Sequence, residues 1–234
     1  MKRLLVSKFM YEDVKAELSK HFDIIELDEN KSLDKPVNTH PDMQLLRLDD
    51  EVVVSKSLYV QNEKLADALK LDYKVNFTLS EHTPDYPGDV ILNALRLDSY
   101  LFCKRSSIDE SVVKLAGKKN ITLVNIKQGY SACSTLALDK AVVSADRVIC
   151  EKAFDLGYDV LQISPGGIRL DGYDYGFIGG ASFYDRGRSC VYFFGNIKPH
   201  PDYDNIVAFL AEHSVSVTAF ENLELSDFGG AIAL

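Results

Sequence analysis

The chain has 234 residues, of which 46% are hydrophobic, so it is long and apolar enough to bury a sizeable core. Its formal net charge of −9 and its scattered basic residues argue against a nucleic-acid partner. No stretch reaches the roughly 18 uncharged apolar residues of a membrane span, and the apolar run near the N-terminus is too short for a secretory signal, so we expect a cytoplasmic protein without a membrane partner.

The cysteines and histidines give no sign of a metal centre. The four cysteines lack the close pairing of zinc sites and are too sparse for a disulfide framework, so we expect reduced thiols. None of the five histidines has metal-ligand spacing, and no phosphate-binding glycine motif is present. We therefore expect neither a metal nor another cofactor. The cysteines are Cys103, Cys133, Cys150 and Cys190.

The first predicted elements are a strand over residues 4–7, a helix over residues 11–22 and a strand over residues 24–27. A polar segment that contains proline follows, over residues 28–41. Its length is typical of either a lid over an opening or a long connection between elements.

A short pattern then recurs about every 45 residues and predicts an internal repeat. It consists of alternating apolar residues followed by an aspartate, and each copy leads into a second apolar segment, as in a β-hairpin. The copies end at Asp49, Asp98, Asp139 and, more loosely, Asp185, and the second segments cover residues 52–55, 100–103, 141–144 and 190–193.

Each hairpin is followed by a segment of helical periodicity and then by a short β-branched run. Two helices carry their own end signals: Ser107 and Glu110 have capping-box spacing, and Gly157 suits the left-handed residue after a helix that begins near Asp146. Each copy therefore predicts a strand–strand–helix–strand unit. The helices are expected over 62–69, from 107, from 146 and over 205–213, and the strands over 73–79, 121–126, 158–163 and 215–220.

The two termini supply the parts of a fifth unit. Leu234 ends a segment in register with the first strands of the other units, and residues 4–7 resemble the second strand of the first unit. A unit divided between the termini is typical of a closed ring, because pairing of the terminal strands removes exposed sheet edges.

The sequence therefore predicts one domain over residues 1–234. Its expected fold is α/β, a five-bladed propeller of strand–strand–helix–strand repeats around a pseudo-fivefold axis, closed by pairing of the N- and C-terminal strands. A doubly wound α/β sheet is the alternative, but hairpins recur where that fold has single parallel strands, and its dinucleotide motif is missing.

In organisation, the whole chain resembles the pentein family of guanidino-group modifying enzymes. The family includes arginine deiminase, dimethylarginine dimethylaminohydrolase, agmatine deiminase, amidinotransferases and a non-enzymatic ribosome anti-association factor. In the second unit, Pro87-Gly88-Asp89-Val90 resembles the family's Gly-Gly-Asp-Val segment. The resemblance implies that Asp89 receives a substrate guanidinium, which a carboxylate binds through two hydrogen bonds. The alternative is that Asp89 is a turn residue.

The chain departs from the family's two other catalytic motifs. The family nucleophile is a cysteine in a terminal Gly-Gly-x-x-Cys segment, but residues 227–234 contain no cysteine. The family general base is a histidine in a His-x-Asp motif that leads into the third unit, where Tyr130 stands here. The resemblance therefore implies a divergent member whose thiol chemistry is lost or relocated.

A relocated site has two candidate catalytic residues. Cys133 leads into the third unit and is a candidate nucleophile, and His40, in His40-Pro41-Asp42, repeats the family's His-x-Asp spacing in the first unit. The first strands of all units begin at the same end of the ring, where such residues can meet. The alternative is that Cys133 is a buried small hydrophobe and His40 a loop residue.

Polar residues that precede the first strands are the candidate substrate-binding residues. Their carboxylates come from four units and would concentrate negative potential at the opening of the axis, as a cationic guanidine, amidine or polyamine requires. Repeated turns that use aspartate for local hydrogen bonds are the alternative. The set comprises Asp42, Asp89, Asn93, Tyr130, Ser131, Asp174 and Asp227.

The sequence leaves two functions open. The first is binding of a small cationic guanidine- or amidine-type ligand in an acidic axial pocket, with or without hydrolase or transferase activity on a C–N bond. The second is a non-catalytic protein-interaction module, like the ribosome-binding member of the family, which a large exposed apolar patch would favour. A ligand site needs a concave acidic pocket, whereas an interaction module can have the opening plugged by side chains.

Overall fold

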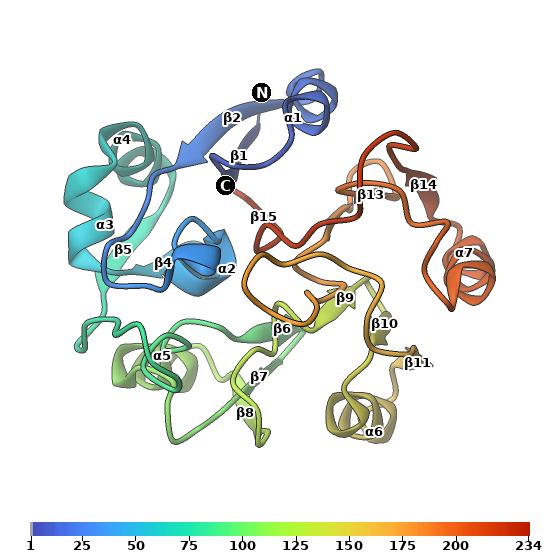
Figure 1. Cartoon of the computed structure of the whole chain (residues 1–234). Coiled ribbons are helices and arrows are strands. Elements are labelled where there is room, and N and C mark those ends of the chain that lie inside the picture. The colour runs from blue at the N-terminus through green and yellow to red at the C-terminus, as the bar shows by residue number, and fades with distance from the viewer. Residues whose placement is uncertain (1) are drawn as a thin grey trace.

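The computed structural model describes residues 2–234, which form five three-stranded sheets arranged as a ring (Figure 1). The helices that connect middle to outer strands lie at the periphery, and the strands surround the axis. This arrangement confirms the predicted five-bladed α/β propeller over the doubly wound alternative.

Every sheet has the same order of inner, middle and outer strand. The inner and middle strands are antiparallel and form the predicted hairpin, whereas the middle and outer strands are parallel and are joined by a helix. The inner strands are β3 (Leu45–Leu48), β6 (Leu95–Leu97), β9 (Thr135–Ala137), β12 (Ser182–Asp185) and β15 (Ala231–Ala233). The middle strands are β4 (Glu51–Val54), β7 (Tyr100–Cys103), β10 (Ala141–Ser144), β13 (Cys190–Phe193) and β1 (Lys2–Ser7). The outer strands are β5 (Lys74–Phe77), β8 (Thr122–Asn125), β11 (Asp159–Gln162), β14 (Ser216–Thr218) and β2 (Phe22–Leu27).

The middle strands form the most deeply buried layer. Strands β4 and β10 are buried at every position, because a strand covered on both faces favours a continuous apolar run. Five hydrophobic clusters fill the interfaces between neighbouring blades. Between the third and fourth blades, for example, Leu136 packs in one cluster with Val191 and Phe193. The sequence repeat thus corresponds to five equivalent interfaces.

The predicted closure of the ring is confirmed. Strand β15 pairs antiparallel with β1, so that Leu5 lies opposite Ile232 and Val6 lies opposite Ala231. Both ends of the described chain therefore lie in the same blade (Figure 1).

The helices that connect middle to outer strands agree in part with the sequence expectations. The helix after the third hairpin ends as predicted, since Asp146 caps it by accepting the Ile149 N–H at 2.9 Å and Gly157 has φ +85°. Among residues 2–234, no helix is both long and apolar enough to cross a membrane. The connecting helices are α1 (Glu12–Ser19), α3 (Lys56–Gln61), α4 (Glu63–Asp72), α5 (Glu110–Lys118), α6 (Arg147–Asp155) and α7 (Tyr203–Glu212).

Two helix predictions were wrong or incomplete. The capping box at Ser107 does not form, because Asp109 is the N-cap of α5 and its Oδ1 accepts the Ser111 N–H at 2.8 Å. Helix α3 was not predicted, because Leu58 is its one buried side chain and the helix carries no clear apolar stripe.

At one end of the ring, here called the hairpin end, short turns join the inner strand to the middle strand in the first four blades. The aspartate that closes the repeated sequence motif lies in these turns, and in three of them it pairs with a cation from the following blade. The repeat therefore encodes charge pairs between successive blades as well as strands. These pairs are Arg96–Asp49, Lys140–Asp98 and Arg186–Asp139.

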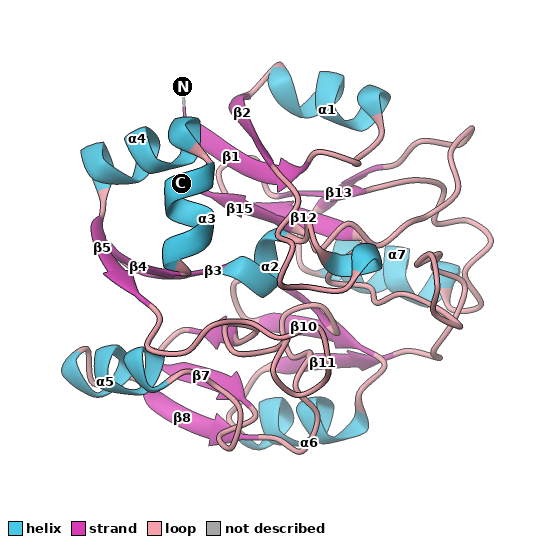
Figure 2. Cartoon of the chain, turned by 60° about the vertical axis from the view of Figure 1, so that its left-hand side comes forward, coloured by secondary structure: helices cyan, strands magenta, loops and turns pink. Residues whose placement is uncertain are grey.

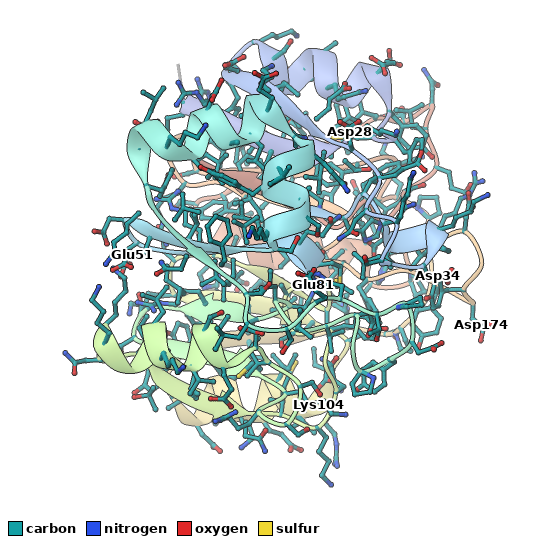
Figure 3. The ribbon with its side chains drawn as sticks, turned by 90° about the vertical axis from the view of Figure 1, so that its left-hand side faces the viewer. Asp28, Asp34, Glu51, Glu81, Lys104 and Asp174 are labelled. Carbon is teal, nitrogen blue, oxygen red and sulfur yellow. The ribbon has the colours of Figure 1, made fainter. Side chains whose placement is uncertain are left out.

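At the opposite end, here called the loop end, connections lead from each outer strand into the next inner strand. The first connection contains the short helices η1 (Lys35–Val37) and α2 (Pro41–Gln44), and α2 contacts β1, β3 and β15 (Figure 2). Residues 28–41 form a packed connection in which the Asn30 N–H donates to the Asn38 carbonyl at 2.8 Å. Figure 3 shows Glu51 of the hairpin end and Asp34 and Asp174 of the loop end on opposite sides of the molecule.

Candidate functional site

A cavity of about 220 Å³ lies at the loop end, where connections from the first, third, fourth and fifth blades meet. Five sequence-predicted site residues line it, including both catalytic candidates. The lining residues are Val37, His40, Met43, Tyr130, Cys133, Leu170, Tyr173, Asp174, Tyr175, Phe177 and Asp227.

Asp227 is the buried carboxylate of the cavity wall. The backbone N–H groups of Phe177 and Gly229 donate to its two oxygens, each at 2.9 Å. Gly180 makes room for this carboxylate, because a Cβ at Gly180 would lie 1.9 Å from Asp227 Oδ1. Burial raises the pKa of Asp227 to about 6, although its two backbone hydrogen bonds lower it. At neutral pH the cavity wall therefore carries a buried negative charge.

Asp42 is a second carboxylate close to Asp227, and it lies in α2 ahead of β3. Its Oδ1 atom is inaccessible to solvent and has no hydrogen-bond partner within residues 2–234. Burial, followed by the charge of Asp227, raises the pKa of Asp42 well above its usual value. In the described chain, the one basic side chain within 4.0 Å of either carboxylate is His40. Two nearby carboxylates thus share a region without a lysine or arginine partner.

His40 and Cys133 line the same cavity but are both neutral at pH 7. His40 Nδ1 lies 3.8 Å from Asp227 Oδ1, which is too long for a hydrogen bond, and burial lowers the pKa of His40 to about 3. Burial, followed by the charges of Asp42 and Asp227, raises the pKa of Cys133 well above its usual value. The thiol is therefore not an activated nucleophile in the unliganded protein.

Asn93 joins the connections of three blades. Its Nδ2 atom lies 3.0 Å from Cys133 Sγ and 3.4 Å from the Asp42 carbonyl oxygen, and its Oδ1 accepts the Ala132 N–H at 2.9 Å. Both ends of the amide are thus engaged within the protein. Asn93 lies beside the cavity without lining it, which suits a residue that positions Cys133 and Asp42.

Asp89 does not line the cavity, but it accepts a hydrogen bond from Tyr130, which does. Asp89 is buried, its Oδ2 accepts the Tyr130 hydroxyl at 2.6 Å, and its Oδ1 has no partner in the described chain. Burial raises the pKa of Asp89, and the Tyr130 hydrogen bond partly offsets this effect. Burial and the Asp89 carboxylate raise the pKa of Tyr130, which remains a neutral donor. Tyr130, rather than Asp89, forms the cavity wall.

Tyr130 belongs to a row of aromatic rings from three blades. Its ring stacks on Tyr86, with centroids 5.6 Å apart and planes at 28°, and on Phe177, at 6.0 Å and 30°. Tyr175 meets Phe177 edge-on at 6.2 Å. We call these four rings the aromatic row. The sequence motifs did not identify Tyr86, Tyr175 and Phe177 as site residues, although three aromatic residues at positions 173, 175 and 177 of a glycine-rich loop were a usable signal.

The other predicted binding residues lie at the margin of this arrangement. Asp174 is exposed at the rim and points away from the molecule in Figure 3. Ser131 is buried without lining the cavity, and its Oγ has no hydrogen-bond partner among residues 2–234. His82 is a buried residue that no sequence motif indicated, and its Nε2 lies 2.8 Å from the Met43 carbonyl oxygen.

Two further spaces adjoin the cavity. A wider depression of about 600 Å³ shares His40 and Asp227 with it. An axial channel of about 310 Å³ runs between the five inner strands, and Asp42, Arg47 and Arg96 are among the residues that line it. Asp42 therefore lines the channel, whereas Asp227 lines the cavity and the depression. No three histidine, cysteine or carboxylate side chains in the described part of the chain are grouped to hold a metal ion.

Solved structures similar to this chain include a hydrolase, a dihydrolase domain and an amidinotransferase. Dimethylarginine dimethylaminohydrolase from Pseudomonas aeruginosa, complexed with citrulline, aligns with a TM-score of 0.62 at 9% identity over 100% of this chain and 99% of that one. The product-bound N-terminal domain of a cyanobacterial arginine dihydrolase aligns at 0.56 and 12% identity over 98% and 94%. The inosamine-phosphate amidinotransferase of Streptomyces griseus aligns at 0.55 and 12% identity over 94% and 77%.

These alignments confirm the predicted pentein fold, and at such low identity they show the fold alone. No curated protein matches the sequence. The match that covers nearly the whole chain, residues 5–232, is to a family of unknown function, and this protein therefore belongs to the DUF6873 family.

Proposed function

We propose that this protein binds a small organic cation with a planar guanidinium or amidinium head group in the loop-end cavity. The observation that carries the proposal is the pair of carboxylates, Asp42 and Asp227, that lack a lysine or arginine partner in residues 2–234. Ionising buried carboxyl groups that lie close together is costly unless a counter-charge joins them, and this cost raises the pKa of both. A bound cation would supply that charge.

A guanidinium or amidinium ion suits these surroundings better than an ammonium ion. Its planar fork of N–H groups matches carboxylate oxygens, and it is more weakly hydrated than an ammonium. The face of an aromatic ring attracts cations, and the Tyr130 ring lines the cavity. The fold likeness to enzymes named for arginine, dimethylarginine and amidino transfer agrees with this choice of ligand.

The residues have distinct proposed roles. Asp227 supplies the counter-charge in the cavity wall, Asp42 adds a second carboxyl group close to Asp227, and Tyr130 supplies the aromatic wall. Asp89 holds the Tyr130 hydroxyl, and Asn93 positions the loops that carry Asp42 and Cys133. Asp174 adds negative potential at the rim, where Ser131 offers no direct contact with the cavity.

Calorimetric titration tests the proposal with methylguanidine and acetamidine beside their uncharged counterparts, methylurea and acetamide. We expect saturable binding of the two cations only, and a loss of affinity of at least 30-fold in Asp227→Asn. Asp98→Asn, which removes a carboxylate at the hairpin end, is the matched control and should leave affinity unchanged. If neither these cations nor an amidine or guanidine with a larger uncharged tail binds the wild-type protein, the proposed function is wrong.

A second candidate function is hydrolysis or transfer at a C–N bond, with Cys133 as nucleophile and His40 as base. It is favoured because both side chains line one cavity beside Asp227. A cation bound next to the thiol would lower its pKa and favour the thiolate. Mass spectrometry after incubation with each cation tests for a covalent adduct and for a product that carries oxygen in place of nitrogen. Binding without turnover would leave a ligand-binding protein without the family's usual thiol chemistry.

A protein-interaction module is the alternative if no cation binds. Large apolar side chains are exposed on the first blade and offer a surface for such a partner: Val60, Leu71 and Leu79.

A further inference from the structure

The walls of the loop-end cavity differ sharply in chemistry. The charged or titratable side chains of its lining are His40, Asp174, Asp227, the Cys133 thiol and three tyrosines, and no lysine or arginine is among the residues that line it. The remaining wall is apolar: Val37 and Met43 are buried in one cluster, and Leu170 and Phe177 pack against that cluster. One side of the cavity therefore suits a cation, and the other suits an uncharged hydrocarbon.

From this asymmetry we infer that the ligand carries charge only in its head group, as an aryl- or alkyl-amidine or -guanidine with an uncharged tail does. An amino acid such as arginine is excluded by this inference. The inference rests on the proposed function, because it assigns the tail of the ligand whose cationic head meets Asp227.

The aromatic row gives the apolar wall a flat shape. The rings of Tyr86, Tyr130 and Phe177 are within 30° of parallel from one neighbour to the next, and Tyr175 meets Phe177 at 88°. Hydrogen bonds fix the row, because the Tyr130 hydroxyl donates to Asp89 and Lys104 Nζ donates to the Tyr86 hydroxyl at 2.7 Å. A planar aromatic tail can stack on such a fixed surface or meet it edge-on.

A ligand with a carboxylate on its tail would meet no lysine or arginine side chain in the lining of the cavity. Arg169 lines the adjoining depression, but its Nε donates to Asp171 at 2.8 Å and its Nη1 donates to Glu224 at 3.3 Å. Lys35 lies on the rim of the same depression and outside the lining of the cavity. A tail carboxylate in the cavity would instead approach Asp174 and Asp227, and like charges repel.

The volume of the cavity agrees with a small ligand. Its 220 Å³ is below the roughly 300–1,000 Å³ of sites for drug-sized molecules. A single ring with an amidine group is of a suitable size, and a larger ligand would have to extend into the depression beside Arg169.

Calorimetric titration of the full-length protein with benzamidine, phenylguanidine, arginine, methylguanidine and benzamide tests the inference. We expect benzamidine or phenylguanidine to bind at least 10-fold more tightly than arginine, and uncharged benzamide not to bind. If arginine binds within 10-fold of both aryl cations, the inference is wrong while the proposed function stands. If neither the aryl cations nor methylguanidine bind, the proposed function fails and the inference fails with it.

Two variants test the wall itself. Phe177→Leu should weaken benzamidine at least fivefold and leave methylguanidine within twofold, because only the tail contacts this ring. Phe154→Leu is the matched control, since Phe154 is exposed on α6, outside the residues that line the cavity, and this change should alter neither affinity. Equal weakening of both ligands in Phe177→Leu, with unchanged thermal unfolding, would overturn the assignment of the tail to this wall.

Discussion

The two ends of the ring use aspartate in opposite ways. At the hairpin end, Asp98 pairs with Lys140 and accepts the Tyr158 hydroxyl, and these contacts lower the pKa of Asp98. At the loop end, burial raises the pKa of Asp227 to about 6 and raises the pKa of Asp42 as well. The carboxylate at the hairpin end is thus balanced by a nearby cation, whereas the carboxylates at the loop end are unbalanced, because no lysine or arginine of the described residues pairs with them. An unbalanced, buried charge stabilises nothing in the unliganded protein, which is why the loop end is the candidate site.

The largest expected effect comes from removing the unbalanced charge in Asp227→Asn. The pKa of Asp227 is about 6 in the folded state, above its unfolded value of 3.8, so folding takes up a proton between these values. The cost of ionising Asp227 is absent below pH 4 and complete above pH 6, at about 3 kcal/mol for a shift of about two units. The free energy of unfolding of Asp227→Asn minus that of wild type should therefore rise by about this amount between pH 4 and pH 7.

Denaturant unfolding at pH 4, 5, 6 and 7 measures this difference, and titrating groups that do not interact with Asp227 cancel on subtraction, whereas Asp42, whose pKa Asp227 raises, contributes to the difference. Asp227→Asn also loses hydrogen bonds of the carboxylate, and this loss changes the free energy of unfolding by the same amount at every pH. A difference in free energy of unfolding that stays constant from pH 4 to pH 7 would show that burial does not raise the pKa of Asp227.

A somewhat smaller effect is expected from Gly180→Ala. The three atoms nearest to a Cβ at this position all belong to the Asp227 carboxyl group, and the closest lies at 1.9 Å. Overpacking should destabilise the protein by about 2 kcal/mol. Gly117→Ala, where nothing lies within 4 Å of the new Cβ, is the control and should be neutral or slightly stabilising.

A double-mutant cycle with Asp227→Ala identifies the cause of that loss. If the carboxyl group is the obstacle, Gly180→Ala should cost at least 1 kcal/mol less in the Asp227→Ala background than in wild type. Equal costs in both backgrounds would assign the loss to the backbone instead.

The third expected effect concerns the hydrogen bond between Asp89 and Tyr130 of the aromatic row. Tyr130→Phe keeps the ring but removes the hydroxyl that donates to Asp89 Oδ2 at 2.6 Å. The buried carboxylate loses its donor, which should destabilise the protein by about 1–2 kcal/mol at pH 7. The pKa of Asp89 should rise further, so the loss should shrink as the pH falls and Asp89 becomes protonated. Unfolding measured at pH 5 and pH 7 checks this, and a loss that grows toward pH 5 would contradict it.

The position of a residue within the repeat predicted its place along the axis but not the direction of its side chain. Residues that precede the inner strands were expected at one end, and His40, Asp42, Cys133 and Asp227 do gather there. Asp174 occupies an equivalent position, yet it is exposed and points outward. The turn that orients Asp174 depends on local backbone geometry, which a repeat pattern does not specify.

The partners of the predicted residues were not predictable for a related reason. The hydrogen bond between Asp89 and Tyr130 and the stacking of Tyr130 on Phe177 join different blades. Each contact is between residues more than 40 positions apart in the sequence. The same is true of the pairs at the hairpin end, where the repeated aspartate was visible but the cation it meets belongs to the next unit.

The smallest effect should come from Asp98→Asn, and its pH dependence should have the opposite sign to that of Asp227→Asn. The pKa of Asp98 is lowered by its hydrogen bonds to Lys140 and Tyr158, so its stabilisation is present above the unfolded pKa and lost as the pH falls through the folded one. Both partners of the ion pair are substantially exposed, and solvent limits its contribution to about 0.5 kcal/mol. The substitution should therefore weaken the protein slightly at pH 7 and leave it unchanged at pH 3, as denaturant unfolding at the two pH values would measure. A variant that is more stable than wild type at pH 7 would show that the hairpin end is strained like the loop end, and the contrast between balanced and unbalanced carboxylates would then no longer single out the candidate site.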